Sequence, residues 1–425
     1  MGVFTSGSDR RLSITSLLFF IVLHSLLVLA MLQWVARSLM PVSYFFGTSV
    51  EAGAVGHEDG RWLRAWRLVA TPAAANRLNY GQLCTLSLLH LASAAVTYLA
   101  VTYVTVAPFG RYAAQTRVPI AIPNTLSWML QEAPTVWNVL FFVLYEYPSA
   151  YQQYHTRSAA GGTDAQPYVH LVMEALALLR LPLLLFLFHY IHRSFIFPLF
   201  LGRSRNDTPL HVTLSATAYC LFNGRLQLLA SITLYPVPHD AGGGASLVEF
   251  FFNRGAQSSL CLVWLLALVA LGGSYCFFRG MYINMMSDYM LIDLRRQRQR
   301  PLARDHQTAE VRALKQNYAI PYGFYFEHVS CPNFYGELVE WLGYAVTVLA
   351  TGVVRPHPSA AFGALGFGRA AAAFSFFVYT AANLVPRAVC HHAWYIHTFG
   401  DAYRALHRRA IFPWYRAAYR EDRHE

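Results

Sequence analysis

Long apolar runs separated by short polar segments make up most of this chain. Seven of these runs follow one another at residues 83–107, 126–147, 170–200, 209–235, 258–282, 335–354 and 369–395. Each is long enough to cross about 30 Å of hydrocarbon as a helix. An eighth run, residues 12–35, is longer than the apolar part of a cleavable signal peptide and is predicted to be a retained signal anchor. The pattern predicts an all-α integral membrane protein. Residues 83–425 form a seven-transmembrane-helix bundle, and residues 1–82 form an N-terminal extension that carries the extra hydrophobic helix.

Composition supports a membrane protein with several spans. Hydrophobic residues make up 55% of the 425 residues and charged residues 13%, against roughly 25% charged residues in a soluble domain. The aromatic share of 15% suits belts of rings at the two membrane interfaces. The six cysteines form no CxxC pair and are predicted to be core or bilayer residues. The chain has no nucleic-acid motif and no soluble domain.

The charge pattern orients the predicted bundle. The net charge of +11 is almost entirely arginine, because Lys315 is the only lysine. Arginines cluster in the loop that follows residues 258–282 and again in the C-terminal tail, which predicts that both lie on the cytosolic side. The Arg-bearing segment 37–82 then falls on the other side, against this rule. The sequon at Asn206 falls in a cytosolic loop and is predicted to stay unglycosylated.

The most informative stretch runs from Ala319 to Trp341. It opens with a Pro–Gly turn signal and enters an apolar run that carries Asn333, Glu337 and Glu340. Asn333 and Glu337 are four residues apart and share a helix face. Carboxylates at this depth are costly unless they face a cavity or a partner, although a helix cap with interfacial charge explains the same pattern.

Two other runs carry polar groups at helical spacing. Trp128 and Glu132 share a face near the start of one run, where Glu132 is either a site residue or a partner of the helix dipole. Tyr190 and Arg193, three residues apart, face either one cavity or the interfacial belt. A histidine pair at 189 and 192 has no HxxHH boxes around it, and we expect no metal.

Two polar stripes follow on later helices. The first consists of Asn284, Asp288 and Arg295, and the second of Arg387, His391 and Tyr395. Steps of four and seven residues keep the members of each stripe on one helix face. Several such stripes, mostly near the predicted cytosolic ends, indicate a shared polar cavity, and the arginines suit phosphate groups. No GxGxxG follows a strand pattern, so a nucleotide site here is not a Rossmann fold.

Six motifs in order resemble the steroid 5α-reductase family. They are SWMLQEAPTVW, HYIHRSFIFP, AYCLFNGRLQ, GMYINMMSDYMLIDLRR, IPYGFYFEHVSCPNFYGELVEWLGYAV and NLVPRAVCHHAWYIHTFGDAYRALHRRAIFPW. APFGRY resembles a further short element of the family. The resemblance covers residues 105–415, and residues 1–80 have no counterpart in it.

The resemblance implies a seven-helix fold in the endoplasmic reticulum membrane that encloses NADPH and a 3-oxo-Δ4 steroid. Hydride would pass to C5 of the steroid and a proton to C4. The tyrosine and glutamate that hold the 3-oxo group in the family match Tyr190 and Glu132, with Trp128 in the same substrate site. The family's NADPH contacts match Asn284, Asp288, Arg295, Asn333, Glu337, Arg387, His391, Tyr395 and Arg408.

Departures from the family pattern leave substrate identity open. The Gly–Gly after the Ile–Pro turn is Gly323-Phe324 here. Two extra residues near the end mean that Arg404 or Arg409 could take the place of Arg408. Trans-2-enoyl-CoA reductases and polyprenal reductases share parts of the pattern. A catalytically silent sterol-binding membrane protein is the alternative from outside the enzymes.

Overall fold

The computed structural model describes residues 75–104, 121–149, 152, 167–177, 179–201, 207–231, 260–298, 318–352 and 361–414. The predicted signal anchor, most of the N-terminal extension, the APFGRY element, the sequon at Asn206 and most of the basic loop lie outside the described residues.

Helices account for nearly all of the described residues. They are α4 (Ala75–Leu99), α5 (Asn124–Phe141), α7 (Tyr168–Ala177), α8 (Leu181–Ile191), α9 (Phe197–Phe200), α10 (Leu210–Ser231), α12 (Leu260–Arg298), α14 (Pro332–Gly352), α15 (Ala361–Phe399) and α16 (Asp401–Arg404). The π-helical turns are η2 (Ala100–Val104), η4 (Phe142–Glu146) and η5 (His192–Ile196), and η6 (Phe324–Glu327) is a 3-10 turn. The described chain is therefore all-α apart from one two-residue strand pair.

Among the described residues, four helical segments are long and apolar enough to cross a membrane. They are Leu86–Tyr103, Leu181–Phe200, Trp264–Gln297 and Gly368–Phe399. The predicted class, an all-α integral membrane protein, agrees with this finding. Helices α5, α10 and α14 coincide with three further apolar runs, but they carry buried polar side chains. A count of seven spans stays a prediction.

The run 170–200, expected as one span, is two helices. Helix α7 ends at Ala177, and α8 begins at Leu181 after Arg180 in an extended conformation. Pro182 lies in the first turn of α8, where its missing N–H is harmless and its fixed φ suits a helix start. The proline ring also disfavours the helical conformation of the residue before it, which makes it harder for a helix to continue into Pro182 from α7. The span proper is therefore Leu181–Phe200.

Two helices are longer than the apolar runs that predicted them. Helix α12 continues from residue 282 to Arg298, and α15 begins at Ala361 and ends at Phe399. The added turns of α12 contain neither proline nor glycine, so nothing in their sequence stops the helix. This extension holds Asn284 and Asp288 in register with the rest of α12.

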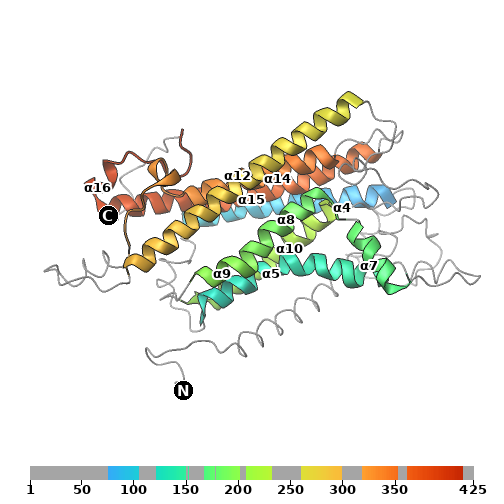
Figure 1. Cartoon of the computed structure of the whole chain (residues 1–425), viewed down its shortest axis with the longest axis horizontal. Coiled ribbons are helices and arrows are strands. Elements are labelled where there is room, and N and C mark those ends of the chain that lie inside the picture. Colours follow the sequence, from blue (N-terminus) through green and yellow to red (C-terminus); the bar gives the residue numbers. More distant parts are fainter. Residues whose placement is uncertain are drawn as a thin grey trace, which may run out of the picture.

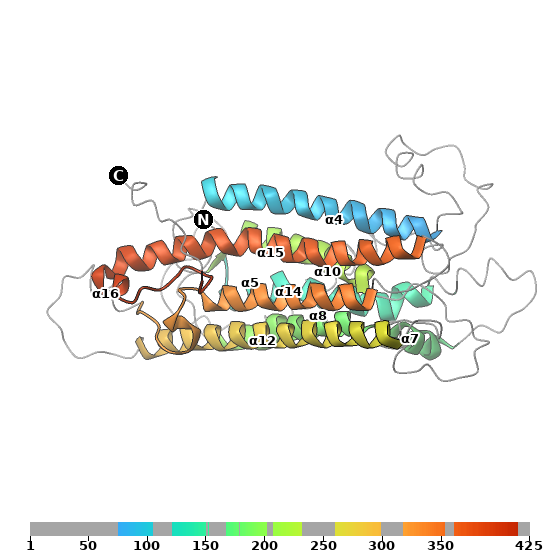
Figure 2. The same cartoon turned by 90° about the horizontal axis from the view of Figure 1, so that it is seen from above.

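The long helices form a row in which each packs against the next. Helix α14 contacts α12 on one side and α15 on the other, and α15 contacts α4. Figure 2 shows α4 and α12 on opposite outer sides, with α15 and α14 between them. Helices α5, α8 and α10 lie beside this row, and α8 contacts both α12 and α14 (Figure 1).

Glycines set the close, antiparallel crossing of α12 and α14. A Cβ on Gly280 would lie 2.2 Å from the Glu340 backbone nitrogen, and a Cβ on Gly343 would lie 2.5 Å from the Gly273 carbonyl oxygen. Gly280 faces Gly336 and Gly273 faces Gly343, so residue numbers rise along one helix as they fall along the other, and the two contacts lie seven residues apart on each helix. Small residues let the two backbones touch, as is common in membrane helices. The crossing faces the polar residues of the two helices toward each other.

Helices α5 and α10 run in the same direction. The strands that precede them, β1 (Ala121–Ile122) and β2 (Thr208–Pro209), pair antiparallel with Ala121 opposite Pro209 and Ile122 opposite Thr208. A hydrogen bond of 2.6 Å joins the hydroxyls of Ser127 and Thr213 one turn further on. This alignment fixes the height of Glu132 relative to α10.

The turn at 323–324 explains one departure from the family pattern. Gly323 has a φ of +86° and Phe324 a φ of +53°, so both lie in the left-handed region. A glycine in the second position avoids a steric cost of about 1–2 kcal/mol that phenylalanine bears. The Phe324 ring packs edge-on against Tyr282, which helps to offset this cost.

Candidate active site

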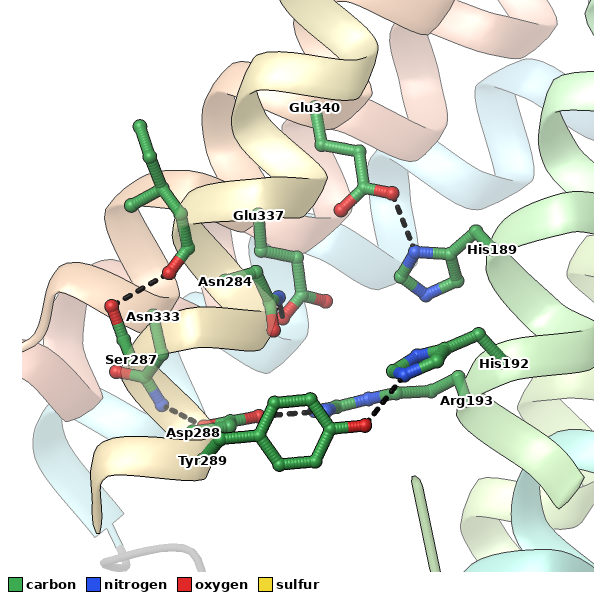
Figure 3. A network of polar contacts seen from close by, with 11 residues as sticks. His189, His192, Arg193, Asn284, Ser287, Asp288, Tyr289, Asn333, Glu337 and Glu340 are labelled. Atoms are coloured by element: carbon green, nitrogen blue, oxygen red, sulfur yellow. Dashed lines mark hydrogen bonds and ion pairs between the residues drawn. The ribbon is translucent and has the colours of Figure 1, made fainter. Parts of the chain in front are cut away.

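Asp288 is the centre of a polar network between η5, α12 and α14. Its Oδ2 accepts a 2.7 Å charge-assisted hydrogen bond from Arg193 Nη1, and its Oδ1 accepts one of 2.9 Å from Asn333 Nδ2 (Figure 3). One turn back along α12, Asn284 Nδ2 donates to Glu337 Oε2 at 3.3 Å. The structure thus brings together four of the nine predicted cofactor residues.

The sequence spacing accounts for this convergence. Asn284 and Asp288 are four residues apart on α12, and Asn333 and Glu337 are four apart on α14. Each pair therefore occupies one face of its helix. The glycine crossing turns these two faces toward each other and leaves room for hydrogen bonds between them.

A π-helical turn places Arg193 in the network. Arg193 belongs to η5, where the wider turn changes the direction of the side chains that follow α8. Its guanidinium lies over the ring of Trp128 at 4.7 Å and over that of Phe197 at 4.6 Å. Trp128, a predicted substrate residue, therefore helps to hold the arginine that binds Asp288.

Glu132 and Tyr190 come together from α5 and α8. The two side chains lie close enough to interact electrostatically, and Tyr190 is only 4% exposed. The Cys220 thiol, on α10, donates a weak hydrogen bond to Glu132 Oε2 at 3.7 Å. Glu132 also lies within electrostatic range of Arg193, His189 and Glu337. A buried phenol and a half-buried carboxyl group thus lie near the Asp288 network.

A second buried acid lies beside Tyr190. His189 Nδ1 and Glu340 Oε1 are 2.6 Å apart, and Glu340 is fully buried. The His189 ring contacts those of Tyr190 and Trp341, with centroids 5.0 and 4.6 Å apart. Neither His189 nor Glu340 was among the predicted site residues.

The predicted residues of α15 lie along one face of that helix, beyond the Asp288 network. The Arg387 guanidinium is 5.0 Å from the centre of the Phe334 ring, and the His391 ring is 5.8 Å from it. Since Phe334 follows Asn333 on α14, this group adjoins the network directly. Further along, the Tyr395 ring stacks on that of Tyr403 at 5.0 Å.

Arg408 is buried with donors that have no acceptor in the described part of the chain. Its Nη1 donates to the Pro321 carbonyl at 2.7 Å, and its side chain is 1% exposed. Its Nη2 lies 3.8 Å from a Glu327 carboxylate oxygen, which is an ion pair but too long for a hydrogen bond. Within the described residues, its Nε and Nη2 have no hydrogen-bond acceptor.

Ser330 ties this C-terminal segment to the bundle. Its hydroxyl lies 2.6 Å from both His392 Nδ1 and the Tyr403 hydroxyl. Its backbone N–H donates to the Arg409 carbonyl at 2.8 Å, within a short parallel bridge between Val329 and Arg409. Burial raises the pKa of Tyr403 to about 12, so this phenol stays protonated at neutral pH. The segment that carries Arg408 is thus held in one position.

Arg295 is the predicted cofactor residue that the structure does not bring to the others. It is exposed on α12, nearly two turns beyond Asp288. Cys220 was expected only as a core or bilayer residue. Arg193 was predicted to face either a cavity or the interfacial belt, and His189 and Glu340 were noted as polar positions without a role at the site. The contact of Arg193 with Asp288 depends on the π turn, which the sequence did not predict.

A buried polar network inside an all-α membrane bundle is the arrangement of a membrane-embedded enzyme, and comparison with known proteins identifies the family. The family model for 3-oxo-5-alpha-steroid 4-dehydrogenase matches residues 206–354 and 364–415. Steroid 5-alpha-reductase DET2 of Gossypium hirsutum is 30% identical over 310 residues, which are 72% of this chain and 87% of that protein.

Two further relatives, from a plant and an animal, agree. Steroid 5-alpha-reductase DET2 of Arabidopsis thaliana is 31% identical over 281 residues, or 61% of this chain and 85% of that protein. The 3-oxo-5-alpha-steroid 4-dehydrogenase 1 of Rattus norvegicus is 27% identical over 309 residues, which are 72% of this chain and 85% of that protein. The chain belongs to the steroid 5α-reductase family, as its motifs indicated. Like its relatives, it is an oxidoreductase of the class that acts on CH–CH bonds.

Proposed function

We propose that this protein is a membrane-embedded, NADPH-dependent reductase of the C4–C5 double bond of 3-oxo-Δ4 steroids. The observation that carries the proposal is that half-buried Glu132 and buried Tyr190, from two helices, lie within electrostatic range of each other near the Asp288 network. The names of the relatives describe steroid reductases and dehydrogenases, which supports a steroid as the substrate.

Glu132 and Tyr190 suit the charge that this reaction creates. Addition of hydride to C5 of a conjugated enone moves negative charge onto the 3-oxo oxygen. A phenol and a protonated carboxyl group can both donate hydrogen bonds to that oxygen. In a water-poor site such donors are aimed before the reaction starts, and one of them is worth about 10²–10³ in rate. The Cys220 contact at 3.7 Å helps to orient Glu132.

The residues around Arg408 fit a long anionic cofactor. Two buried donors of Arg408 have no acceptor among the described residues, and an anionic oxygen would satisfy them. Arg387 and His391 lie between Arg408 and the Asp288 network along α15. NADPH has phosphates at one end and a nicotinamide at the other, and when bound it would supply the hydride. In this proposal Arg408 and Arg387 hold phosphate charge, while Asn284, Asp288, Asn333 and Glu337 hold the nicotinamide end.

The proposal extends to domains and location. Residues 83–425 form the catalytic domain, and the extension 1–82 anchors it in the endoplasmic reticulum membrane. The basic loop and the C-terminal tail face the cytosol, where NADPH is available. An unmodified Asn206 in cells would agree with this orientation, whereas a glycosidase-sensitive mass shift that disappears in Asn206→Gln would overturn it.

An assay of purified protein tests the proposed reaction. NADPH consumption is measured with three substrate classes: 4-en-3-one steroids, trans-2-enoyl-CoAs and polyprenals. The proposal expects consumption with the steroids, and a product two mass units heavier that keeps its ketone. Turnover confined to the other two classes would contradict it. The variant Glu132→Ala, Tyr190→Phe serves as the inactive control.

A further inference from the structure

The His189–Glu340 pair is a buried acid–base pair that the hydride step does not use. Glu340 comes from α14 and His189 from α8, and 2.6 Å separates Oε1 from Nδ1. Glu340 is fully buried and His189 is 5% exposed. Glu340 Oε2 has no hydrogen-bond partner within the described residues. The pair therefore stands apart from the Asp288 network, whose members bond to one another.

Burial favours the form of this pair that holds an extra proton. An ionised carboxylate with one oxygen unbonded is costly in a place closed to water. A Glu340 carboxylate beside a neutral His189 imidazole carries one negative charge. Adding one proton makes the pair neutral. That proton lies either on Glu340 or on the imidazole, and in both forms the pair is neutral. It is thus a store for one proton inside the bundle.

The second ring nitrogen of His189 is oriented so that it can pass this proton toward the site. Nδ1 of His189 is paired with Glu340, so Nε2 is the ring nitrogen that faces away from the pair. Figure 3 shows Nε2 on the side of Glu337 and His192, away from Glu340. His189 also lies within electrostatic range of Glu132, Glu337 and Arg193. Its ring contacts that of Tyr190, one of the two groups proposed to hold the steroid oxygen.

The proposed reaction needs such a proton in every turnover. When hydride adds to C5, the electron pair of the C4–C5 double bond is left shared between C4 and the 3-oxo oxygen. A new C4–H bond restores the ketone. Glu132 and Tyr190 are engaged on the oxygen as hydrogen-bond donors, and either would lose that role if it gave its proton to carbon. The donor to C4 is therefore a third group.

We propose that His189 gives C4 its proton through Nε2–H, and that Glu340 is the positioning residue that holds the His189 ring and keeps the pair charged with that proton. This inference rests on the proposed function. The electron pair at C4 takes the proton, the C4–H bond forms, and the Nε2–H bond breaks. The pair is left with one negative charge, which the nearby Arg193 guanidinium offsets. Water restores the proton after the product leaves.

Isotope effects on Glu340→Gln separate a proton role from a structural one. A glutamine side chain keeps the shape and can still accept a hydrogen bond from Nδ1–H, but it cannot hold the proton. Loss of a general acid typically lowers the rate about 10²-fold or more. Turnover is measured with a 4-en-3-one steroid that the wild type accepts, using NADPH deuterated at the transferred position and, separately, D₂O as solvent.

The proposal expects a change in which step limits the rate. In Glu340→Gln the effect of deuterated NADPH on kcat falls toward 1, while the D₂O effect rises above that of the wild type. If Glu340→Gln does not fold, His189→Gln, which removes the other member of the pair on α8, should show the same two isotope effects. Glu174→Gln is the control and should behave as the wild type. The Glu174 carboxylate, on α7, accepts a 3.1 Å hydrogen bond from the Tyr147 hydroxyl.

Two outcomes would overturn the role of His189. One is near-native turnover in both variants, and the other is a loss of activity in which both isotope effects stay at their wild-type values. In either case the steroid reductase proposal would stand, because it depends on the wild type. If the wild type reduces no 4-en-3-one steroid, the proposed function itself fails.

Discussion

The two ends of the site differ in how their polar groups are satisfied. Around Asp288, donors and acceptors from η5, α12 and α14 bond to one another. Around Arg408, two buried donors have no acceptor among the described residues. A network that satisfies itself fixes positions, while a buried cation with free donors favours an anion. The difference agrees with the proposed function, in which the first region orients the reacting groups and the second holds charged parts of the cofactor.

The largest effect should be a loss of stability when the hydrogen-bonded network around Asp288 is broken. In Asp288→Ala the Arg193 guanidinium loses its 2.7 Å carboxylate partner while its side chain stays 14% exposed. Removing one partner of a buried ion pair typically costs about 3–5 kcal/mol. Thermal unfolding in detergent or nanodiscs measures the loss. Asp293→Ala is the matched control on the same helix, because Asp293 is 67% exposed and pairs with Arg296 only at 3.8 Å. Equal stability of the two variants would contradict this reading of the network.

The next effect is on the chemistry. Tyr190→Phe and Glu132→Ala should each lower kcat by about 10²–10³, as expected for loss of one donor to a developing oxyanion. NADPH affinity should stay near that of the wild type. Since both groups act on one oxygen, the double variant should lose less than the product of the two effects. Kinetics of the three variants measure this, and near-native steroid reduction by the double variant would remove both residues from the mechanism.

Much of this arrangement could be predicted from residue spacing, and part of it could not. The pairs Asn284–Asp288 and Asn333–Glu337 were predicted because a four-residue step keeps two side chains on one helix face. That these two faces meet depends on the backbone contact at Gly280, which is a property of two helices together. A single sequence carries the spacing within each helix but no record of which helices touch.

Other features depend on backbone detail that residue patterns do not carry. Arg193 reaches Asp288 from a π turn, and the sequence HYIHR reads equally well as an α-helix end. The break before Pro182 was readable in principle, but the continuous apolar run masked it. Arg295 is exposed near the end of α12, so the cofactor role that helical spacing and the resemblance predicted for it stays a prediction.

A change in the region around Arg408 should have a smaller effect, confined to the affinity for NADPH. Arg408→Ala should weaken NADPH binding by roughly ten- to a hundredfold, because a hydrogen bond to a charged group contributes about 1.5–3 kcal/mol. Steroid affinity should change much less. Arg404→Ala is the comparison variant, because Arg404 is an alternative match to the family's arginine but is 54% exposed and pairs with Asp401 in solvent. A larger loss of NADPH affinity in Arg404→Ala than in Arg408→Ala would favour that alternative. Titration of NADPH fluorescence measures both variants, and unchanged NADPH affinity in Arg408→Ala would move the phosphate site elsewhere.

The smallest expected effect concerns the crossing that supports both regions. Gly280→Ala introduces a methyl group 2.2 Å from the Glu340 backbone nitrogen, and overpacking of this kind costs about 1–3 kcal/mol. Gly272→Ala, two turns away on the same helix, meets no atom within 4 Å and should gain slightly in helix propensity. Melting temperatures of the two variants give the comparison, and an equal shift in both would argue against a close crossing.

The position of the transferred hydrogen tests the central claim most directly. Wild-type protein is given a 4-en-3-one steroid and NADPH deuterated at the transferred position of the nicotinamide, and the product is examined by NMR and mass spectrometry. The account predicts one deuterium at C5, an intact 3-oxo group and a new hydrogen at C4 that comes from solvent. Deuterium at C3, which marks reduction of the ketone, or a product without deuterium would contradict it.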